Sequence, residues 1–589
     1  MPINSFKEDE HVSDVKKSVT VKRLLSYLLA YKKQIIIVLF IMAYNIGVQL
    51  INPLILESAL DDYISPKNFK GLSILISVAV VINIIWVILV RARMSIMAGV
   101  TNGVIKTVRE QVYTHLQTLD FKFFDGRPTG KILSRIIGDV NSLRDVLNNF
   151  VITLIPDFLL VTSVLVIMII KNPPLALAAV SGLPIMAVGL FYIETKSRVR
   201  WQIHRKKSSN LNAFLHEEIS GIRIVKSYAA EEETLETFDE LVKEHKDSFI
   251  DAVKVNDLFN SVIEISEAVS IIAMYYVGVM KLGIRGDSLG ILVAFTSYAV
   301  SFWQPIASLG NFYNQIITNI AAAERVFEVI DTEPAIKDEE DVTKMPAIKG
   351  RVRFDDVSFS YEDGVEVLKH VNFDITPGET IALVGPTGAG KTTIVNLISR
   401  FYDVQRGRVL IDNSDVKKVS IYSLRSQLGI MTQDNFLFTG TIKDNIRYGK
   451  LDATDEEIEN ACKTVGAHDF ITKLEKGYDT ELSERGGGLS QGQKQLLAFA
   501  RTIISDPKIL ILDEATSSID TKSELLVQAG IEKILQGRTS FVIAHRLSTI
   551  RKADRIFVIQ DGGIAEEGNH EGLMNKQGIY YQLQMAQHV

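Results

Sequence analysis

The sequence predicts a six-helix, all-α membrane domain over residues 1–330, followed by an α/β domain with a phosphate-binding loop over residues 331–589. Three observations predict this fold class. The 589 residues exceed what one hydrophobic core usually serves, so at least two domains are expected. Apolar stretches of roughly 20 residues recur before Asp331 and stop after it. In the second half, a short apolar run ends in a glycine-rich loop, and a helical pattern follows.

The apolar stretches are long enough to cross a hydrocarbon core of about 30 Å as helices. They cover residues 34–56, 72–90, 150–170, 175–193, 258–280 and 289–317. The first is expected to remain as a membrane helix, because a polar and basic segment precedes it and no small-residue cleavage site follows closely. Just before it, residues 19–33 contain apolar side chains among basic ones, which is typical of a helix lying at the membrane surface. A disordered tail is the alternative.

Basic residues predict the orientation. Lysines and arginines are concentrated between residues 16 and 33, whereas the link over residues 57–70 also carries acids. The long links over residues 91–149 and 196–257 are basic and helical in pattern, which predicts stalks on the same side of the membrane as the N-terminus. We therefore expect a multi-pass protein of the cell (plasma or inner) membrane, with its N-terminus and second domain in the cytoplasm.

Composition argues against three features: a nucleic-acid partner, an internal disulfide framework and a zinc site built on several thiolates. The chain has 64 Lys plus Arg against 70 Asp plus Glu, a formal net charge of -6, so it lacks the basic field that attracts nucleic acid. Its single cysteine, Cys462, excludes an internal disulfide framework and a zinc site built on several thiolates.

The strongest motif is the glycine-rich loop at residues 385–392, which reads Gly-Pro-Thr-Gly-Ala-Gly-Lys-Thr. It matches the pattern G-x-x-x-x-G-K-[ST] in full, between a predicted buried strand over residues 380–384 and a helical pattern over residues 393–401. Backbone N–H groups of such a loop wrap phosphates, and the helix N-terminus adds its partial positive charge. Lys391 is expected to reach the terminal phosphates, and Thr392 to ligate Mg²⁺.

A second predicted strand, over residues 509–512, ends in Asp513 and Glu514, where parallel strands face a ligand. Asp513 is expected to hold magnesium through its water shell, and Glu514 to polarise the water that attacks the terminal phosphoryl group. The alternative is that both acids cap the following turn. His545 follows an apolar strand over residues 540–544 and is placed to bond the terminal phosphate, although a histidine at a strand end is more often structural.

With these motifs, the chain resembles an ATP-binding cassette (ABC) exporter half-transporter. Residues 489–493, Leu-Ser-Gln-Gly-Gln, resemble the family signature LSGGQ, and residues 484–486 match the exporter segment that touches the membrane domain. The resemblance implies an α/β P-loop nucleotide-binding domain that hydrolyses ATP with Mg²⁺ to drive transport. The ATP-binding residues that it implies are Tyr361, Gly385, Thr387, Gly388, Ala389, Gly390, Lys391, Thr392 and Thr393. It implies catalytic roles for Glu514, His545 and Gln433, and magnesium contacts from Thr392, Gln433 and Asp513. It also implies that Asp520 communicates across a dimer.

The resemblance extends to the membrane domain. Residues 123–139, 221–231 and 323–327 are similar to exporter patterns after the second span, after the fourth span and at the join between the domains. By this likeness, the cytoplasmic turns near residues 119–127 and 212–223 are coupling helices that contact the cassettes. A purely structural role for these loops is the alternative.

A single cassette implies pairing. In the family, ATP lies between the phosphate loop of one cassette and the signature of the other, and here the signature residues are Ser490, Gln491, Gly492 and Gln493. Gln491 stands where the family has its middle glycine, and its side chain restricts the backbone near phosphate. The chain therefore resembles one subunit of a bacterial heterodimeric multidrug exporter with one fully competent ATP site. A homodimer with two equal sites is the alternative.

Acidic residues inside the predicted spans indicate what is transported. Glu264 and Glu267 lie one helical turn apart in the fifth span, and Asp157 interrupts the third. With nearby aromatic rings they would suit amphipathic cations; the alternative is that they pair with basic residues of neighbouring helices or lie near the cytoplasmic edge. We therefore predict ATP-driven export of amphipathic small molecules by alternating access. A homodimeric lipid flippase is the alternative, and an ATP-gated channel or a non-transporting regulatory ATPase is favoured less.

Overall fold

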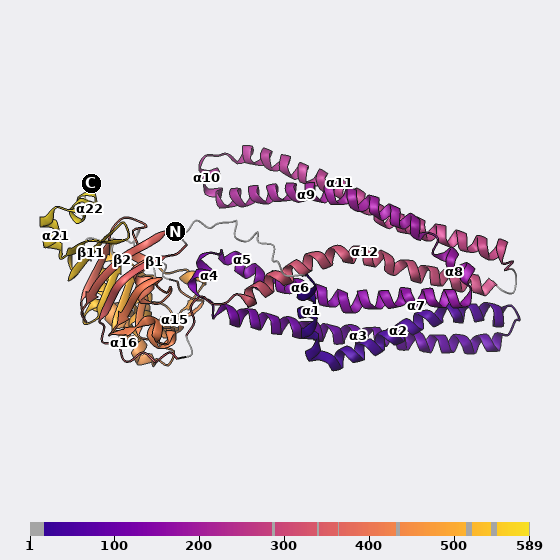
Figure 1. Ribbon diagram of the computed structural model, residues 1–589, viewed down its shortest axis with the longest axis horizontal. Helices are drawn as coiled ribbons and strands as arrows, with labels where there is room; N and C mark the ends of the chain where they lie inside the picture. The colour runs from indigo at the N-terminus through magenta and orange to yellow at the C-terminus, as the bar shows by residue number, and fades with distance from the viewer. Residues whose placement is uncertain are drawn as a thin grey trace. The chain divides into compact units, whose positions relative to one another are not determined.

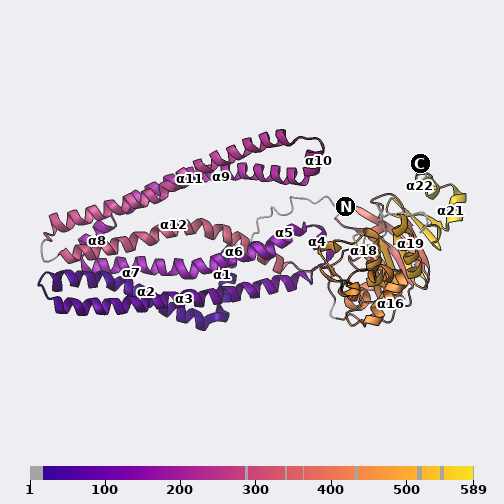
Figure 2. The same ribbon diagram turned by 180° about the vertical axis from the view of Figure 1, so that it is seen from behind.

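The computed structural model describes residues 17–284, 289–338, 341–362, 364–431, 436–513, 521–543 and 550–587. These residues form two compact units (Figures 1 and 2). Of the described residues, the helical unit contains residues 17–117 and 130–332, with the gap given above, and the α/β unit contains residues 118–129 and those from 333 onward. A short segment between two membrane helices of the sequence, Thr118–Thr129, therefore belongs to the α/β unit.

The helical unit is built mainly from long helices. Its α-helices are α1 (Lys17–Ser26), α2 (Lys32–Ser58), α3 (Phe69–Leu116), α5 (Thr129–Ser134), α6 (Val140–Asn149), α7 (Ile155–Lys171), α8 (Pro173–Ala179), α9 (Leu183–Ser220), α10 (Ile222–Ser227), α11 (Glu231–Tyr276) and α12 (Leu289–Asp331). Short 3₁₀ or π turns link several of them, namely η2 (Tyr27–Tyr31), η3 (Ala59–Ile64), η4 (Arg135–Asp139), η5 (Phe150–Leu154) and η6 (Val277–Lys281). Because these turns continue the helices beside them, the unit has few irregular connections.

Six helical segments of the described chain are long and apolar enough to cross a membrane. They are Val19–Ile64, Phe69–Leu116, Thr129–Lys171, Pro173–Ser220, Glu231–Lys281 and Leu289–Ile306. Each contains or overlaps one of the predicted apolar stretches, so the prediction of six spans is confirmed. Several segments are about twice the roughly 20 residues that a bilayer requires, and α3 alone has 48 residues. The extra length forms helical stalks.

Helices α9 and α11 lie side by side as a hairpin that α10 closes at one end (Figures 1 and 2). Close packing at the other end depends on small side chains: the Gly182 N–H donates to Ser270 Oγ at 2.9 Å, and a Cβ at Gly182 would overlap the carbonyl oxygen of Ser266. The turn predicted near residues 212–223 begins later than expected, because α9 continues to Ser220. The chain turns instead around α10, after Gly221.

The α/β unit contains all the described strands. They are β1 (Val352–Ser360), β2 (Glu366–Ile375), β3 (Thr380–Val384), β4 (Arg406–Ile411), β5 (Ser414–Asp415), β6 (Leu428–Met431), β7 (Gly440–Thr441), β8 (Glu481–Leu482), β9 (Ile509–Asp513), β10 (Thr539–Ile543), β11 (Arg555–Gln560) and β12 (Gly563–Gly568). Its α-helices are α4 (Phe121–Asp125), α13 (Lys391–Ile398), α14 (Ile421–Arg425), α15 (Ile442–Arg447), α16 (Asp455–Val465), α17 (His468–Ile471), α18 (Gln491–Ile503), α19 (Thr521–Leu535), α21 (His570–Lys576) and α22 (Ile579–Gln587).

A six-stranded sheet of order β12-β11-β3-β10-β9-β6 forms the centre of the α/β unit, as far as the chain is described. Its strands run parallel except for β12 at the edge. Alternate residues of each strand pack on opposite faces: Ile381 and Leu383 face a core shared with β1 and β2, whereas Ala382 and Val384 face one shared with α16 and α18. Both faces are buried, which explains the continuous apolar runs of β3, β9 and β10 in the sequence.

Candidate functional site

The predicted nucleotide-binding residues follow the carboxyl ends of the parallel strands. The phosphate loop follows β3, Asp513 is the last residue of β9, and the register pairs Asp513 with Ile543 at the end of β10. Three predicted residues, Gln433, Glu514 and His545, come within two residues of the ends of β6, β9 and β10 but lie outside the described residues, as does Asp520. Since parallel strands end at one edge of the sheet, this edge is the candidate site.

Positive φ angles shape the phosphate loop. Gly385, Gly388 and Gly390 have φ values of +146°, +84° and +106°, which side chains disfavour. A Cβ at Gly385 would also overlap the carbonyl oxygen of Ile559 in β11, and one at Gly390 would lie 2.7 Å from Leu368 Cδ2. A Cβ at Gly388 would meet open space. Gly385 and Gly390 are therefore required by packing within the protein, whereas Gly388 is required only by its backbone conformation.

Lys391 begins α13, directly after the loop, and is buried. Its Nζ donates to the carbonyl oxygens of Gly385 and Pro386 at 2.8 and 2.9 Å, so the ammonium group is held across the mouth of the loop. Burial lowers the pKa of Lys391, and the Asp513 carboxylate opposes that effect. Asp513 therefore lies close enough to Lys391 to raise the pKa of its ammonium group. An anion entering the loop would take over the hydrogen bonds that the carbonyl groups accept now.

The remaining loop residues differ in exposure. Thr387 and Thr392 are exposed, whereas Thr393 is buried. The half-buried Tyr361 donates its hydroxyl hydrogen to Thr393 Oγ1 at 3.2 Å and accepts one from Asn396 Nδ2 at 3.3 Å. Tyr361, the predicted adenine-stacking residue, is thereby fixed to α13, the helix that follows the phosphate loop.

Tyr402 makes a contact that the sequence did not reveal. Its hydroxyl donates to Asp125 Oδ2 in α4, the short helix within the predicted coupling turn at residues 119–127. Its ring meets that of Tyr361 edge to face, with centroids 4.9 Å apart. Burial and the Asp125 carboxylate raise the pKa of Tyr402, so it remains a neutral donor. In a second contact, the ring of Phe121 packs against that of Phe401 at a tilt of 34°, with centroids 4.2 Å apart. The aromatic pair after α13 thus attaches α4 to the cassette.

The signature residues form the start of α18. Ser490 is its N-cap: Ser490 Oγ accepts from the Gln493 N–H at 3.3 Å, and Gln493 Oε1 accepts from the Ser490 N–H at 2.9 Å. This capping box leaves the Ser490 hydroxyl hydrogen available to donate outward. Gln491 is exposed at the first helical position, whereas Gly492 is buried. The side chain in place of the family's glycine therefore stands at the surface, beside the hydroxyl group.

The acidic residues of the membrane helices divide into two environments. Glu264 is exposed on the surface of the isolated chain, Glu267 is partly buried, and the two carboxylates are close enough to repel each other. Ser266 and Ser270, on another face of α11, are fully buried. Asp157 differs, because it interacts electrostatically with Arg93 of α3. Glu264 and Glu267 therefore remain the candidate contacts for a ligand.

Two family models match the chain in the same order as its domains. One, described as the ABC transporter transmembrane region, matches residues 35–306, and the other, described as ABC transporter, matches residues 368–517.

Related proteins match over nearly the full length. An ABC transporter ATP-binding protein of Bacillus subtilis, YknV, is 41% identical over 96% of this chain and 94% of its own. An ATP-dependent lipid A-core flippase of Syntrophus aciditrophicus is 36% identical over 90% of this chain and 88% of its own. A Staphylococcus aureus protein with the name "Putative multidrug export ATP-binding/permease protein" is 35% identical over 97% of this chain and all of its own. The structure of a bacterial Atm1-family ABC exporter with ATP bound is 28% identical, with a TM-score of 0.77, over 95% of this chain and 98% of that chain.

Proposed function

This chain belongs to the ABC transporter family, as an exporter half-transporter whose ATPase is coupled to transport, and we propose that it exports amphipathic small molecules of the multidrug type. The observation that carries the proposal is the carboxylate pair Glu264 and Glu267 in the fifth span. Carboxylates at membrane depth are costly unless they serve a cavity or a ligand, and an amphipathic cation supplies both the charge and the apolar body. The multidrug name of the Staphylococcus aureus relative supports the same substrate class.

We infer that ATP binds at the carboxyl edge of the central sheet. The phosphate loop supplies N–H donors, Lys391 exchanges its two carbonyl partners for the terminal phosphates, and the ring of Tyr361 stacks on adenine. Glu514 acts as the base that orients the attacking water, His545 bonds the terminal phosphate, and Gln433 joins this site to the membrane domain. The Thr392 hydroxyl and the Asp513 carboxylate are hard oxygen donors that suit Mg²⁺. The bound ion would neutralise charge on the phosphates.

The partner supplies the second half of each ATP site. We propose a heterodimer in which this chain's Lys391, Asp513 and Glu514 complete a competent site against the partner's signature. The other site would use Ser490 to Gln493 of this chain, where the Gln491 side chain is exposed and would restrict the backbone near the phosphate. That site is expected to hydrolyse slowly. ATP would close the two cassettes, the stalks would carry the motion to the spans, and hydrolysis would reset the pair.

The proposed orientation places the stalks and cassettes in the cytoplasm of a cell-membrane protein, because the basic residues lie in the stalks and before the first span. Lipid transport is the second candidate function, and the lipid A-core flippase relative is the observation that favours it. A flippase acts on a substrate that already lies in the bilayer. Its ATPase would therefore respond to the lipid headgroup rather than to added cations.

One experiment tests the substrate class. In the assembled transporter in lipid, Glu264→Gln with Glu267→Gln should abolish stimulation of ATP hydrolysis by amphipathic cations while stimulation by neutral analogues remains. The matched control is Glu233→Gln with Glu236→Gln, a pair of the same spacing on the same helix but outside the apolar stretch. Unchanged cation stimulation in the span variant would make the two acids structural, and stimulation by lipid alone would favour the flippase.

A second experiment tests the pairing and the base. Mass spectrometry of proteins that copurify with this chain from mild detergent should identify a different half-transporter. Cooperative ATP hydrolysis and transport by this chain alone would support a homodimer instead.

In either assembly, Glu514→Gln should still bind ATP but lose turnover at the competent site. Near-normal hydrolysis at that site would remove Glu514 as the base.

A further inference from the structure

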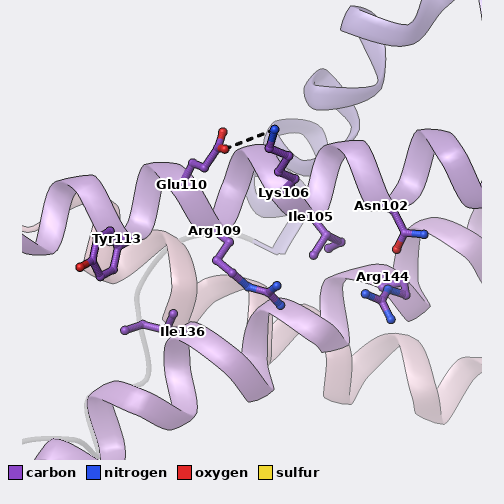
Figure 3. A pocket seen from close by; sticks show the side chains of 8 residues that line it. All are labelled: Asn102, Ile105, Lys106, Arg109, Glu110, Tyr113, Ile136 and Arg144. Atoms are coloured by element: carbon purple, nitrogen blue, oxygen red, sulfur yellow. Dashed lines mark ion pairs between the residues drawn. The ribbon is translucent and has the colours of Figure 1, made fainter. Parts of the chain in front are cut away.

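A pocket of about 490 Å³ lies between α3 and the η4–α6 segment of the helical unit (Figure 3). Its lining consists of Asn102, Ile105, Lys106, Arg109, Glu110, Tyr113, Ile136 and Arg144. The α3 residues follow one face of the helix, at spacings of three and four residues. Three of the lining side chains are cationic and one is a carboxylate, so the pocket carries an excess of positive charge.

The arginines are the significant charges in this pocket. Glu110 forms an ion pair with Lys106: the Nζ of Lys106 lies 3.6 Å from Glu110 Oε1, on the exposed side of α3. Arg109 and Arg144 come from opposite walls, and their guanidinium groups occupy the space between the two helices (Figure 3). Arg109 Nη2 donates to Asn141 Oδ1 at 3.2 Å. Within the described chain, however, the Nε atoms of both arginines are buried without a hydrogen-bond partner.

Such groups indicate an anionic ligand. The only carboxylate among the lining residues, Glu110, pairs with Lys106, so an anion that accepts from the two guanidinium groups gains free energy. Guanidinium groups bind phosphate oxygens through paired N–H donors. Ile105, Ile136 and the ring of Tyr113 provide apolar surface next to the charges. We propose that this pocket binds a free organic phosphate that carries an apolar group.

Position distinguishes a soluble ligand from a lipid headgroup. The apolar stretch predicted in α3 ends at Val90, and α3 continues without interruption to Leu116. Asn102 and Tyr113 are therefore about 18 and 35 Å farther along the helix, at 1.5 Å per residue. The headgroup layer extends only about 5–8 Å beyond the hydrocarbon core. On the orientation proposed above, the pocket opens to the cytoplasm, beyond the reach of a bilayer phosphate.

Calorimetric titration of the assembled transporter in detergent tests the proposal. Phenyl phosphate is the probe, inorganic phosphate is the comparison, and every arm carries Lys391→Met to weaken phosphate binding in the cassettes. We expect phenyl phosphate to bind more tightly than inorganic phosphate. Arg109→Gln and Arg144→Gln should each weaken its binding about tenfold or more, which is the effect of losing a charge-assisted hydrogen bond. Arg91→Gln removes an exposed charge from the same helix outside the pocket and should leave binding unchanged.

Further arms keep the test decisive. Arg109→Lys and Arg144→Lys keep the charge and should bind better than the glutamine variants, and tryptophan emission checks folding, because Trp86, Trp201 and Trp303 all lie in the helical unit. No binding when both arginines are present, or equal weakening by Arg91→Gln, would overturn the proposal. Binding detected only in bilayers containing phosphatidylglycerol would assign the site to a lipid headgroup. Because the assay reads neither hydrolysis nor transport, its failure would leave the proposed export function unaffected.

Discussion

Two glycines of the phosphate loop should differ in why they are needed. We predict that Gly385→Ala destabilises the cassette without nucleotide, whereas Gly388→Ala mainly affects nucleotide binding. Both residues have a positive φ, which costs about 1–2 kcal/mol for a residue with a side chain. Only at Gly385 would the new methyl group overlap backbone, namely the carbonyl oxygen of Ile559 in β11. Relieving that overlap requires β11 to move relative to β3, which raises the expected cost to about 3 kcal/mol or more.

Hydrogen–deuterium exchange of the full-length protein is the appropriate assay. Tryptophan fluorescence would not report on this region, because all three tryptophans, Trp86, Trp201 and Trp303, lie in the helical unit. A cost of about 3 kcal/mol corresponds to roughly a hundredfold loss of protection in β3 and β11, against about 5- to 30-fold for Gly388→Ala. Equal loss in the two variants, or a larger loss for Gly388→Ala, would refute the packing argument.

Three further predictions concern other contacts of the α/β unit. Tyr402→Phe keeps the ring but removes the hydrogen bond to Asp125, which is worth about 1 kcal/mol for a carboxylate this exposed. This variant should lower substrate stimulation of ATP hydrolysis several-fold. ATP binding, measured in a nucleotide titration, should be unchanged. Ser490→Ala removes the N-cap of α18 and should cost about 1 kcal/mol in protection of that helix by hydrogen exchange; an unchanged exchange rate would contradict the capping role. Burial raises the pKa of Cys462 to about 12, so maleimide should label this thiol at pH 8 only after unfolding, as mass spectrometry can show.

The elements that the sequence predicted best are those with simple physical signatures. The predicted strand over residues 380–384 coincides with β3, because a strand buried on both faces has a continuous apolar run, here residues 381–384. The six spans were predictable because the bilayer sets a minimum length for an apolar helix. The phosphate loop was predictable because its geometry restricts residue type at several positions at once.

What the sequence could not predict depends on contacts between distant residues. Tyr402 and Asp125 are 277 positions apart, and no local pattern links them. Arg109 and Arg144 lie on different helices, so their shared pocket appears only when α3 packs against α6. The start of the turn at α10 was predicted too early, because residues 212–220 have ordinary helix-forming composition and only Gly221 ends α9.

The central claim is that nucleotide bound at the edge of the parallel sheet drives movement of an amphipathic molecule across the membrane. Uptake of a fluorescent amphipathic cation into sealed proteoliposomes holding the assembled transporter, with ATP added outside, measures this directly. We predict ATP-dependent uptake that disappears when Lys391→Met removes the ammonium group at the mouth of the loop, with the exposed Lys473→Met as the control in the same unit. Uptake that is the same with and without ATP, or the same in the Lys391 variant, would contradict the account.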